Sequence, residues 1–128
     1  MKKKVLIVVS DYYKDIADSL LKSTKKFLNK KTKLNIIKVP GVFEIPVMIS
    51  KNINKFDGFV AIGCVIKGKT AHFDLISKSV IDAIMNLSID SKKPIGNCIL
   101  TCFNHKQALA RKKKGREAAI ALNSILYK

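Results

Sequence analysis

The sequence has no apolar run long enough to cross a membrane. Its longest runs, 5–9 and 59–66, are far shorter than the roughly 20 residues that a membrane-spanning helix needs. The basic start at 1–4 is followed by a short apolar stretch that reaches Asp11 without a small-residue cleavage site, unlike a secretory signal. We therefore expect a cytoplasmic protein without a membrane partner.

Cysteine and proline are also scarce, with three residues of each in the 128-residue chain. Cys64, Cys98 and Cys102 are odd in number and form no CxxC pair, so we predict buried free thiols instead of a disulfide framework or a metal site. Because 48% of the residues are hydrophobic, the chain has the composition of a folded protein. Its length predicts one domain, spanning 1–128.

Arginine is rare in a chain whose net charge is +16. Only Arg111 and Arg116 occur among the 25 basic residues, whereas nucleic-acid readers favour arginine for its bidentate and stacking contacts. The lysines are spread along the whole chain, which favours a solvated surface and no nucleic-acid partner. The alternative is a basic interaction module, which needs its lysines on one face and forms salt-sensitive complexes.

Short apolar runs alternate with segments of helical period. The runs predict strands at 4–9, 33–38, 59–65 and 95–101, and the other segments predict helices at 14–29, 43–54, 73–87, 104–113 and 115–126. Pro46 fits the 43–54 helix only in its first turn. Strands separated by helices pair in parallel and carry helices on both faces. The fold class is therefore α/β, a three-layer sandwich around a parallel sheet.

The loop between the third strand and the next helix has the residue types of a reactive site. Gly68, Thr70 and His72 lie just before a helix, where backbone N–H groups can hold a phosphate. A histidine there can exchange protons at neutral pH. The alternative is an ordinary solvated histidine, which is the commoner case for a lone histidine in a loop.

Three sequence blocks carry a family resemblance. They are VPGVFEIP at 39–46, GCVIKGKTAHFD at 63–74, and PIGNCILT at 94–101 followed by Gln107, Ala108 and Arg111. In this order and at these intervals they resemble the signature blocks of the 6,7-dimethyl-8-ribityllumazine synthase family. Three consecutive blocks are far more specific than any one of them.

The resemblance implies a fold, a reaction and an assembly. The implied fold is a four-stranded flavodoxin-like domain, and the implied assembly is a homopentamer with active sites between neighbouring subunits. The implied reaction joins 5-amino-6-(D-ribitylamino)uracil to 3,4-dihydroxy-2-butanone 4-phosphate through an imine, loss of phosphate and ring closure. The family needs no metal or organic cofactor.

The resemblance also implies roles for individual residues. His72 falls on the general acid/base and Arg111 on the phosphate-binding arginine. Lys69 and Thr70 fall on the loop whose backbone helps to hold that phosphate, although their residue types alone fit an ordinary turn. Tyr12 falls on the aromatic residue that stacks on the pyrimidine, with the adjacent Tyr13 as the alternative.

Two further segments match substrate-binding positions. Val42, Phe43 and Glu44 match the segment that binds the ribityl chain, but Glu44 also fits as a favourable acid in the first turn of a helix. Cys64, Val65 and Ile66 match the segment whose main chain reads the pyrimidine edge. Without the resemblance, 64–66 would be plain strand core.

The chain also departs from the family pattern. Asn97 stands where many members place a phenylalanine from the adjacent subunit, so an aromatic wall of the pocket is missing or remade. Only three lysines separate Arg111 from Gly115, fewer than in the usual linker, and the N-terminal segment is short. We therefore expect an isolated pentamer and not a sixty-subunit shell.

Other flavodoxin-like proteins fit less well. The segment Ser10 to Tyr13 lacks the dense hydroxyls of a flavin-phosphate cradle. The third strand ends in Gly63 and Cys64 and not in an acceptor aspartate. A flavin carrier and a phosphoacceptor domain are therefore disfavoured.

Overall fold

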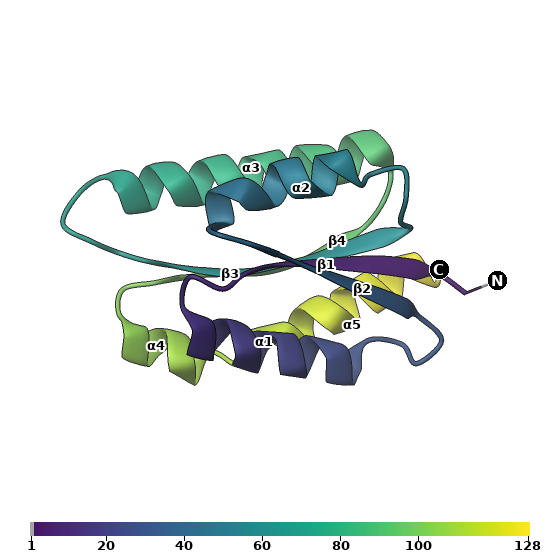
Figure 1. Ribbon diagram of the computed structural model, residues 1–128, viewed down its shortest axis with the longest axis horizontal. Helices are drawn as coiled ribbons and strands as arrows, with labels where there is room; N and C mark the ends of the chain where they lie inside the picture. Colours follow the sequence, from purple (N-terminus) through teal and green to yellow (C-terminus); the bar gives the residue numbers. More distant parts are fainter. Residues whose placement is uncertain (1) are drawn as a thin grey trace.

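The computed structural model describes residues 2–128 and shows a sheet between two layers of helices (Figure 1). Met1, the start of the expected domain, lies outside the described residues. The strands are β1 (Lys4–Ser10), β2 (Lys33–Val39), β3 (Gly58–Ile66) and β4 (Ile95–Cys102). All pairings are parallel and the order is β2-β1-β3-β4. The predicted α/β sandwich is thus confirmed, and its order is flavodoxin-like.

The two central strands are the most hydrophobic. Six of the seven β1 residues and eight of the nine β3 residues are buried, as expected for parallel strands covered on both faces. The edge strand β2 instead alternates partly buried and exposed positions and carries Lys33 and Lys38. Burial on both faces explains why the β1 and β3 sequences are continuous apolar runs and not alternating ones.

The helices divide between the two faces of the sheet. Helices α1 (Lys14–Phe27), α4 (His105–Ala110) and α5 (Lys114–Leu126) lie on one face, and α2 (Ile45–Lys51) and α3 (His72–Ser91) cover the other (Figure 1). Alternate β1 side chains supply both cores. Val5, Ile7 and Val9 pack in the first, whereas Leu6 and Val8 pack in the second.

The structure has helices in all the predicted regions, but each helix differs from its prediction at one end or at both. The expected 43–54 helix is a 3-10 turn, Val42–Glu44, followed by the shorter α2. Pro46 is in the first turn of α2, as predicted, because it lacks an N–H and its ring would clash with a preceding helical turn. Helix α3 extends four residues beyond 87, to Ser91, and is capped by Lys92, which has a left-handed φ of 58°. Helix α4 is shorter than the expected 104–113.

A close approach at Gly63 shapes the end of β3. A Cβ atom added there would lie 2.5 Å from Val42 Cγ1, so the 3-10 turn packs directly on the backbone of β3. This contact brings the segment after β2 over the carboxyl end of β3. No helix within residues 2–128 is both long and apolar enough to span a membrane.

Candidate active site

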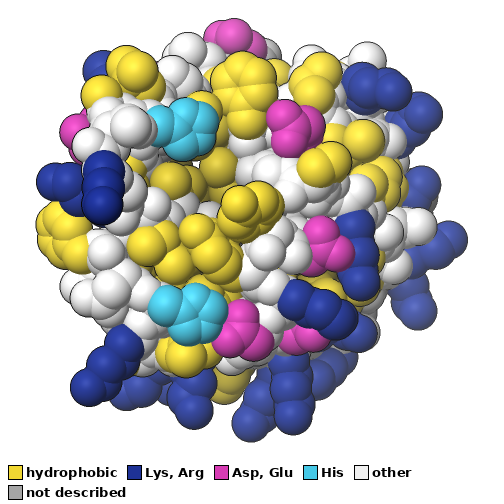
Figure 2. Space-filling view, turned by 60° about the vertical axis from the view of Figure 1, so that its left-hand side comes forward, with side chains coloured by type: hydrophobic (Ala, Val, Ile, Leu, Met, Phe, Trp, Pro, Cys, Tyr) yellow, Lys and Arg dark blue, Asp and Glu magenta, His cyan; other side chains and the backbone are white. Residues whose placement is uncertain are grey.

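A cavity of about 520 Å³, here called the main cavity, opens at the carboxyl ends of β1, β2 and β3. In open α/β sheets this crevice at the β1/β3 switch point is where ligands bind. Figure 2 shows the hollow centre of this face surrounded by hydrophobic side chains, with both histidines beside it and Lys and Arg mainly toward the margin. Its lining residues are Ser10, Tyr12, Tyr13, Gly41, Val42, Phe43, Cys64, Val65, Ile66, His72 and Ile76.

His72 is the first residue of α3 and stands exposed at the rim of the main cavity. Its backbone N–H donates to Thr70 Oγ1 at 3.3 Å, which ties the start of the helix to the preceding loop. Ala71, at the cap position, has no side chain that could satisfy the first N–H groups of α3. The start of this 20-residue helix is therefore suited to an anion beside His72.

Two tyrosines line the main cavity from the turn between β1 and α1. Tyr12 is 73% exposed, and its ring centroid lies 5.0 Å from that of Tyr13 at an interplanar angle of 80°. Burial, followed by the charges of Tyr12 and Cys64, raises the pKa of Tyr13, so its hydroxyl stays protonated at neutral pH. The more exposed ring of Tyr12 has the freer face.

The segment after β2 contributes to the main cavity and to a neighbouring hollow. Val42 and Phe43 line the main cavity. Glu44 lies instead with Phe43 and α3 residues around a smaller cavity of about 320 Å³. A Cβ added to Gly41, which lines the main cavity, would lie 3.2 Å from Glu44 Oε1. The carboxylate is thus close to the rim of the main cavity but not part of its lining.

The three cysteines are free and buried, as predicted. Burial, with a smaller contribution from Cys102, raises the pKa of Cys64 to about 12, and burial likewise raises that of Cys98 to about 12. Thiols with such pKa values are protonated and poorly nucleophilic at neutral pH. Cys64 can therefore offer the main cavity its backbone groups and its bulk, but not a reactive thiolate.

Asn97 and Arg111 lie elsewhere, around a second cavity of about 520 Å³ that we call the β4 cavity. It lies between β4 and the junction of α4 with α5, where Thr101, Lys113 and Lys114 also line it. Within residues 2–128 the two cavities share no lining residue. A single copy of the chain therefore keeps Arg111 apart from His72.

The remaining expected residues, Lys69 and Thr70, are exposed in the loop before α3 and line neither cavity. Ser10, Gly41 and Ile76 also line the main cavity, although the sequence assigned none of them an individual role. Ile76 follows His72 by four residues, and helical spacing could have placed it on the same face. Among residues 2–128, no group of three His, Cys, Asp or Glu side chains is arranged to hold a metal ion.

The fold and the main cavity define the class of protein. It is a doubly wound α/β domain with a cavity at its topological switch point, where ligands bind in such folds, and aromatic and apolar side chains and one histidine line this cavity.

Comparison with known proteins gives the family. The family model described as 6,7-dimethyl-8-ribityllumazine synthase matches residues 2–127. A 6,7-dimethyl-8-ribityllumazine synthase from Agrobacterium fabrum is 41% identical, over 98% of this chain and 93% of its own. Proteins of the same name from Bartonella tribocorum and Corynebacterium kroppenstedtii are 42% and 36% identical, covering 89% and 92% of this chain and 80% and 79% of theirs. The chain belongs to the 6,7-dimethyl-8-ribityllumazine synthase family and is a transferase of riboflavin biosynthesis.

Proposed function

We propose that the main cavity binds 5-amino-6-(D-ribitylamino)uracil and that His72 moves protons during its condensation with 3,4-dihydroxy-2-butanone 4-phosphate. The observation that carries this proposal is the position of His72, on the rim of a cavity that also contains Tyr12 and the end of β3. A histidine within reach of the reacting atoms can serve as general acid and general base in turn. The products are 6,7-dimethyl-8-ribityllumazine, phosphate and water.

The lining of the main cavity suits a neutral, flat pyrimidine with a polyol tail. The exposed ring of Tyr12 offers a π-face for stacking, and the backbone of 64–66 offers hydrogen-bonding groups to the edge of the pyrimidine. Val42 and Phe43 would border the ribityl chain, with the Glu44 carboxylate accepting hydrogen bonds from its hydroxyls.

Proton transfers accompany every bond change in the reaction. The 5-amino nitrogen attacks the keto carbon and water leaves to give an imine. Elimination of phosphate then leaves an enol at the neighbouring hydroxyl-bearing carbon, and this enol tautomerises to a ketone. The ribitylamino nitrogen closes the ring on that new carbonyl with loss of water. His72 is placed to take the proton that the amine gives up and to return one to the departing oxygen.

The anionic phosphate of the second substrate needs cationic partners that a single main cavity does not supply. Lys69 and Thr70 precede His72 in an exposed loop, and the start of α3 adds its dipole. We propose that the β4 cavity of a neighbouring copy completes the site with Arg111 and Asn97. Arg111 would clamp the phosphate with its planar fork.

A shared site implies an oligomer, and the surface supports one. Many large apolar side chains are exposed, among them Leu75, Met85, Ile89, Ile120 and Ile125. Apolar side chains on an oligomerising surface are covered by a neighbouring copy. We propose an isolated ring of five, in which identical heterologous contacts close by rotation. We also propose that this ring works in the cytoplasm, where free thiols such as these stay reduced.

A direct assay tests the function. Purified protein is mixed with both substrates, and product is followed by lumazine fluorescence. We expect fluorescence that depends on each substrate and on protein concentration, above the rate of the uncatalysed condensation. Controls omit each substrate in turn. A rate no higher than that of the uncatalysed mixture would reject the proposal.

A further inference from the structure

A hydrogen bond between two side chains joins two helix starts beside the main cavity. His105 Nε2 lies 2.9 Å from Asp15 Oδ2, which links the first residue of α4 to the first turn of α1 across 90 residues of sequence. Neither residue lines the main cavity, and the reaction proposed above uses neither of them. Both side chains are about half exposed, at 48% and 57%, so the pair adds little to stability.

His105 also contacts the aromatic side of the main cavity. Its ring centroid lies 6.0 Å from that of Tyr13, edge to face at 69°. Tyr13 in turn meets Tyr12 edge to face at 5.0 Å. Successive contacts therefore link the Asp15 carboxylate to the ring of His105, that ring to Tyr13, and Tyr13 to Tyr12. The edge-to-face geometry of the ring pairs is favourable for aromatic side chains.

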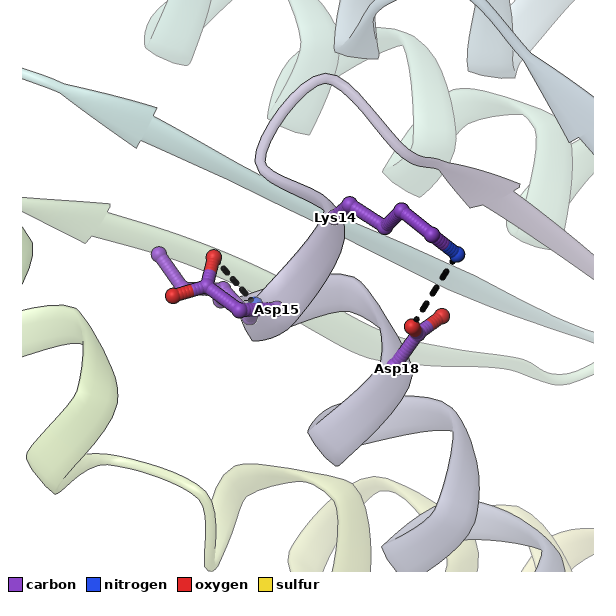
Figure 3. A network of polar contacts seen from close by, with 4 residues as sticks. Lys14, Asp15 and Asp18 are labelled. Carbon is purple, nitrogen blue, oxygen red and sulfur yellow. Dashed lines mark hydrogen bonds and ion pairs between the residues drawn. The ribbon is translucent and has the colours of Figure 1, made fainter.

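Asp15 and the helix start that carries His105 are each held by hydrogen bonds to the backbone. Asp15 Oδ1 accepts the N–H of Ile16 at 2.9 Å, as Figure 3 shows. At the start of α4, Asn104 Oδ1 accepts the N–H of Gln107 at 2.8 Å, and Gln107 Oε1 accepts the N–H of Phe103 at 2.7 Å. These two bonds define the start of α4 and so the place from which His105 reaches Tyr13.

The charge on Asp15 keeps the imidazole oriented. The hydrogen bond from His105 is the largest cause that lowers the pKa of Asp15. A lowered carboxyl pKa means that Asp15 is ionised at neutral pH, so its oxygens can accept hydrogen bonds there. The other titratable groups near this contact are Tyr13, which packs against His105, Tyr12, which packs against Tyr13, and the protonated thiol of Cys64.

We propose that His105, oriented by Asp15, is a positioning residue that holds Tyr13 and through it the ring of Tyr12 in the orientation that stacks on the pyrimidine. This inference rests on the proposed function, in which Tyr12 supplies the stacking face. It assigns His105 a role in seating one substrate and none in proton transfer.

The test measures pyrimidine binding separately from turnover. The chain has no tryptophan and only three tyrosines, two of which line the main cavity, so tyrosine emission can report binding of the ribitylaminouracil alone. For His105→Ala we expect the pyrimidine Kd and KM to rise about 3- to 10-fold, in line with the energy of an aromatic pair. The KM for the keto-phosphate should stay unchanged. His105→Phe, which keeps an edge for Tyr13, should recover most of the affinity.

Asp18→Asn is the matched control. Lys14 and Asp18 form an exposed ion pair in α1, at 3.3 Å (Figure 3). Asp18 is not part of the series of contacts from Asp15 through His105 to the two tyrosines. Breaking that pair should leave both KM values unchanged. The proposal fails if His105→Ala leaves the pyrimidine Kd unchanged, or if it raises both KM values equally.

Tyr12→Ala separates this inference from the function on which it rests. If Tyr12→Ala weakens pyrimidine binding and His105→Ala does not, the stacking role stands and the positioning role is wrong. If Tyr12→Ala has no effect, the stacking role is wrong and the positioning role falls with it. If the unsubstituted protein binds the pyrimidine without forming product, the proposed catalysis fails while the binding test still applies.

Discussion

The main cavity and the β4 cavity have similar volumes, each about 520 Å³, but opposite chemistry. Aromatic and apolar side chains dominate the first, and among the described residues that line it none is lysine or arginine. The second contains Arg111, Lys113 and Lys114. One substrate is a neutral heterocycle and the other carries a phosphate, so each cavity suits a different part of the reaction. The difference supports the proposal that one copy of the chain contributes to two different sites, each completed by a neighbouring copy.

The order of the strands in the sheet explains why the main cavity and the β4 cavity are separate. The crevice at the switch point between β1 and β3 is enclosed by segments that follow three strands. Strand β4 lies at the edge of the sheet, where its outer side can face another molecule. Asn97 Oδ1 accepts the N–H of Ile99 at 3.0 Å along β4, so its side chain satisfies a backbone group of this edge strand.

The largest expected effect comes from replacing His72, which lies at the rim of the main cavity. His72→Ala should lower turnover by about 10- to 10⁴-fold, the range that general acid/base catalysis commonly contributes. Because His72 is exposed at the start of α3, the variant should keep its melting temperature. Steady-state kinetics at saturating substrates measure the effect.

The His72 variant would also reveal a wrong assignment. Circular dichroism confirms that the fold persists, and Lys106→Ala, an exposed substitution in α4, provides the unaffected comparison. Unchanged turnover in His72→Ala would remove this residue from the mechanism and leave the main cavity as a binding site only.

Mixing two variants of low activity tests whether the main cavity of one subunit and the β4 cavity of its neighbour form one active site. His72→Ala supplies an intact β4 cavity, and Arg111→Ala supplies an intact main cavity. If neighbours in a ring share each site, random mixed rings should regain about a quarter of the active sites. The two proteins are unfolded, refolded together and assayed, with each refolded alone as the control.

Light scattering on the same samples measures the assembly. We expect a mass near five chains, and a mass near sixty would reject the isolated ring. Mixed rings without recovered activity would show that His72 and Arg111 do not cooperate across a subunit boundary. An active monomer would overturn the shared site altogether.

Much of the fold could be predicted because the local pattern of apolar residues indicates which strands are buried. Strands β1 and β3 are buried on both faces, so continuous apolar runs marked them to within one residue. Helix ends were less predictable. Pro46 divided the expected 43–54 helix into a 3-10 turn and a short helix, and α3 continued past 87 through residues of weak periodicity.

The site was predictable only in part, for physical reasons. Residues at the carboxyl ends of neighbouring parallel strands must lie together, which gathered Tyr12, Val42 and His72 around one cavity. The separation of Arg111 from His72 depends on which strand lies at the edge of the sheet, and local patterns do not give strand order. The contact of Asp15 with His105 joins residues 90 apart whose types alone suggest only a solvated surface.

The smallest expected effect comes from keeping the charge at Arg111 while changing its shape. Arg111→Lys should raise the KM for the keto-phosphate about 10-fold, because an ammonium keeps the positive charge but loses the bidentate fork. The KM for the pyrimidine should change far less, since Arg111 does not line the main cavity of its own copy, where we propose that the pyrimidine binds. Arg116→Lys is the matched control, because Arg116 lies in α5 with its guanidinium 5.1 Å from the ring centroid of Phe27. Steady-state kinetics with each substrate varied in turn measure both variants. Equal rises in the two KM values would mean that Arg111 supports the whole site and not the phosphate, and the chemical division between the two cavities would then be lost.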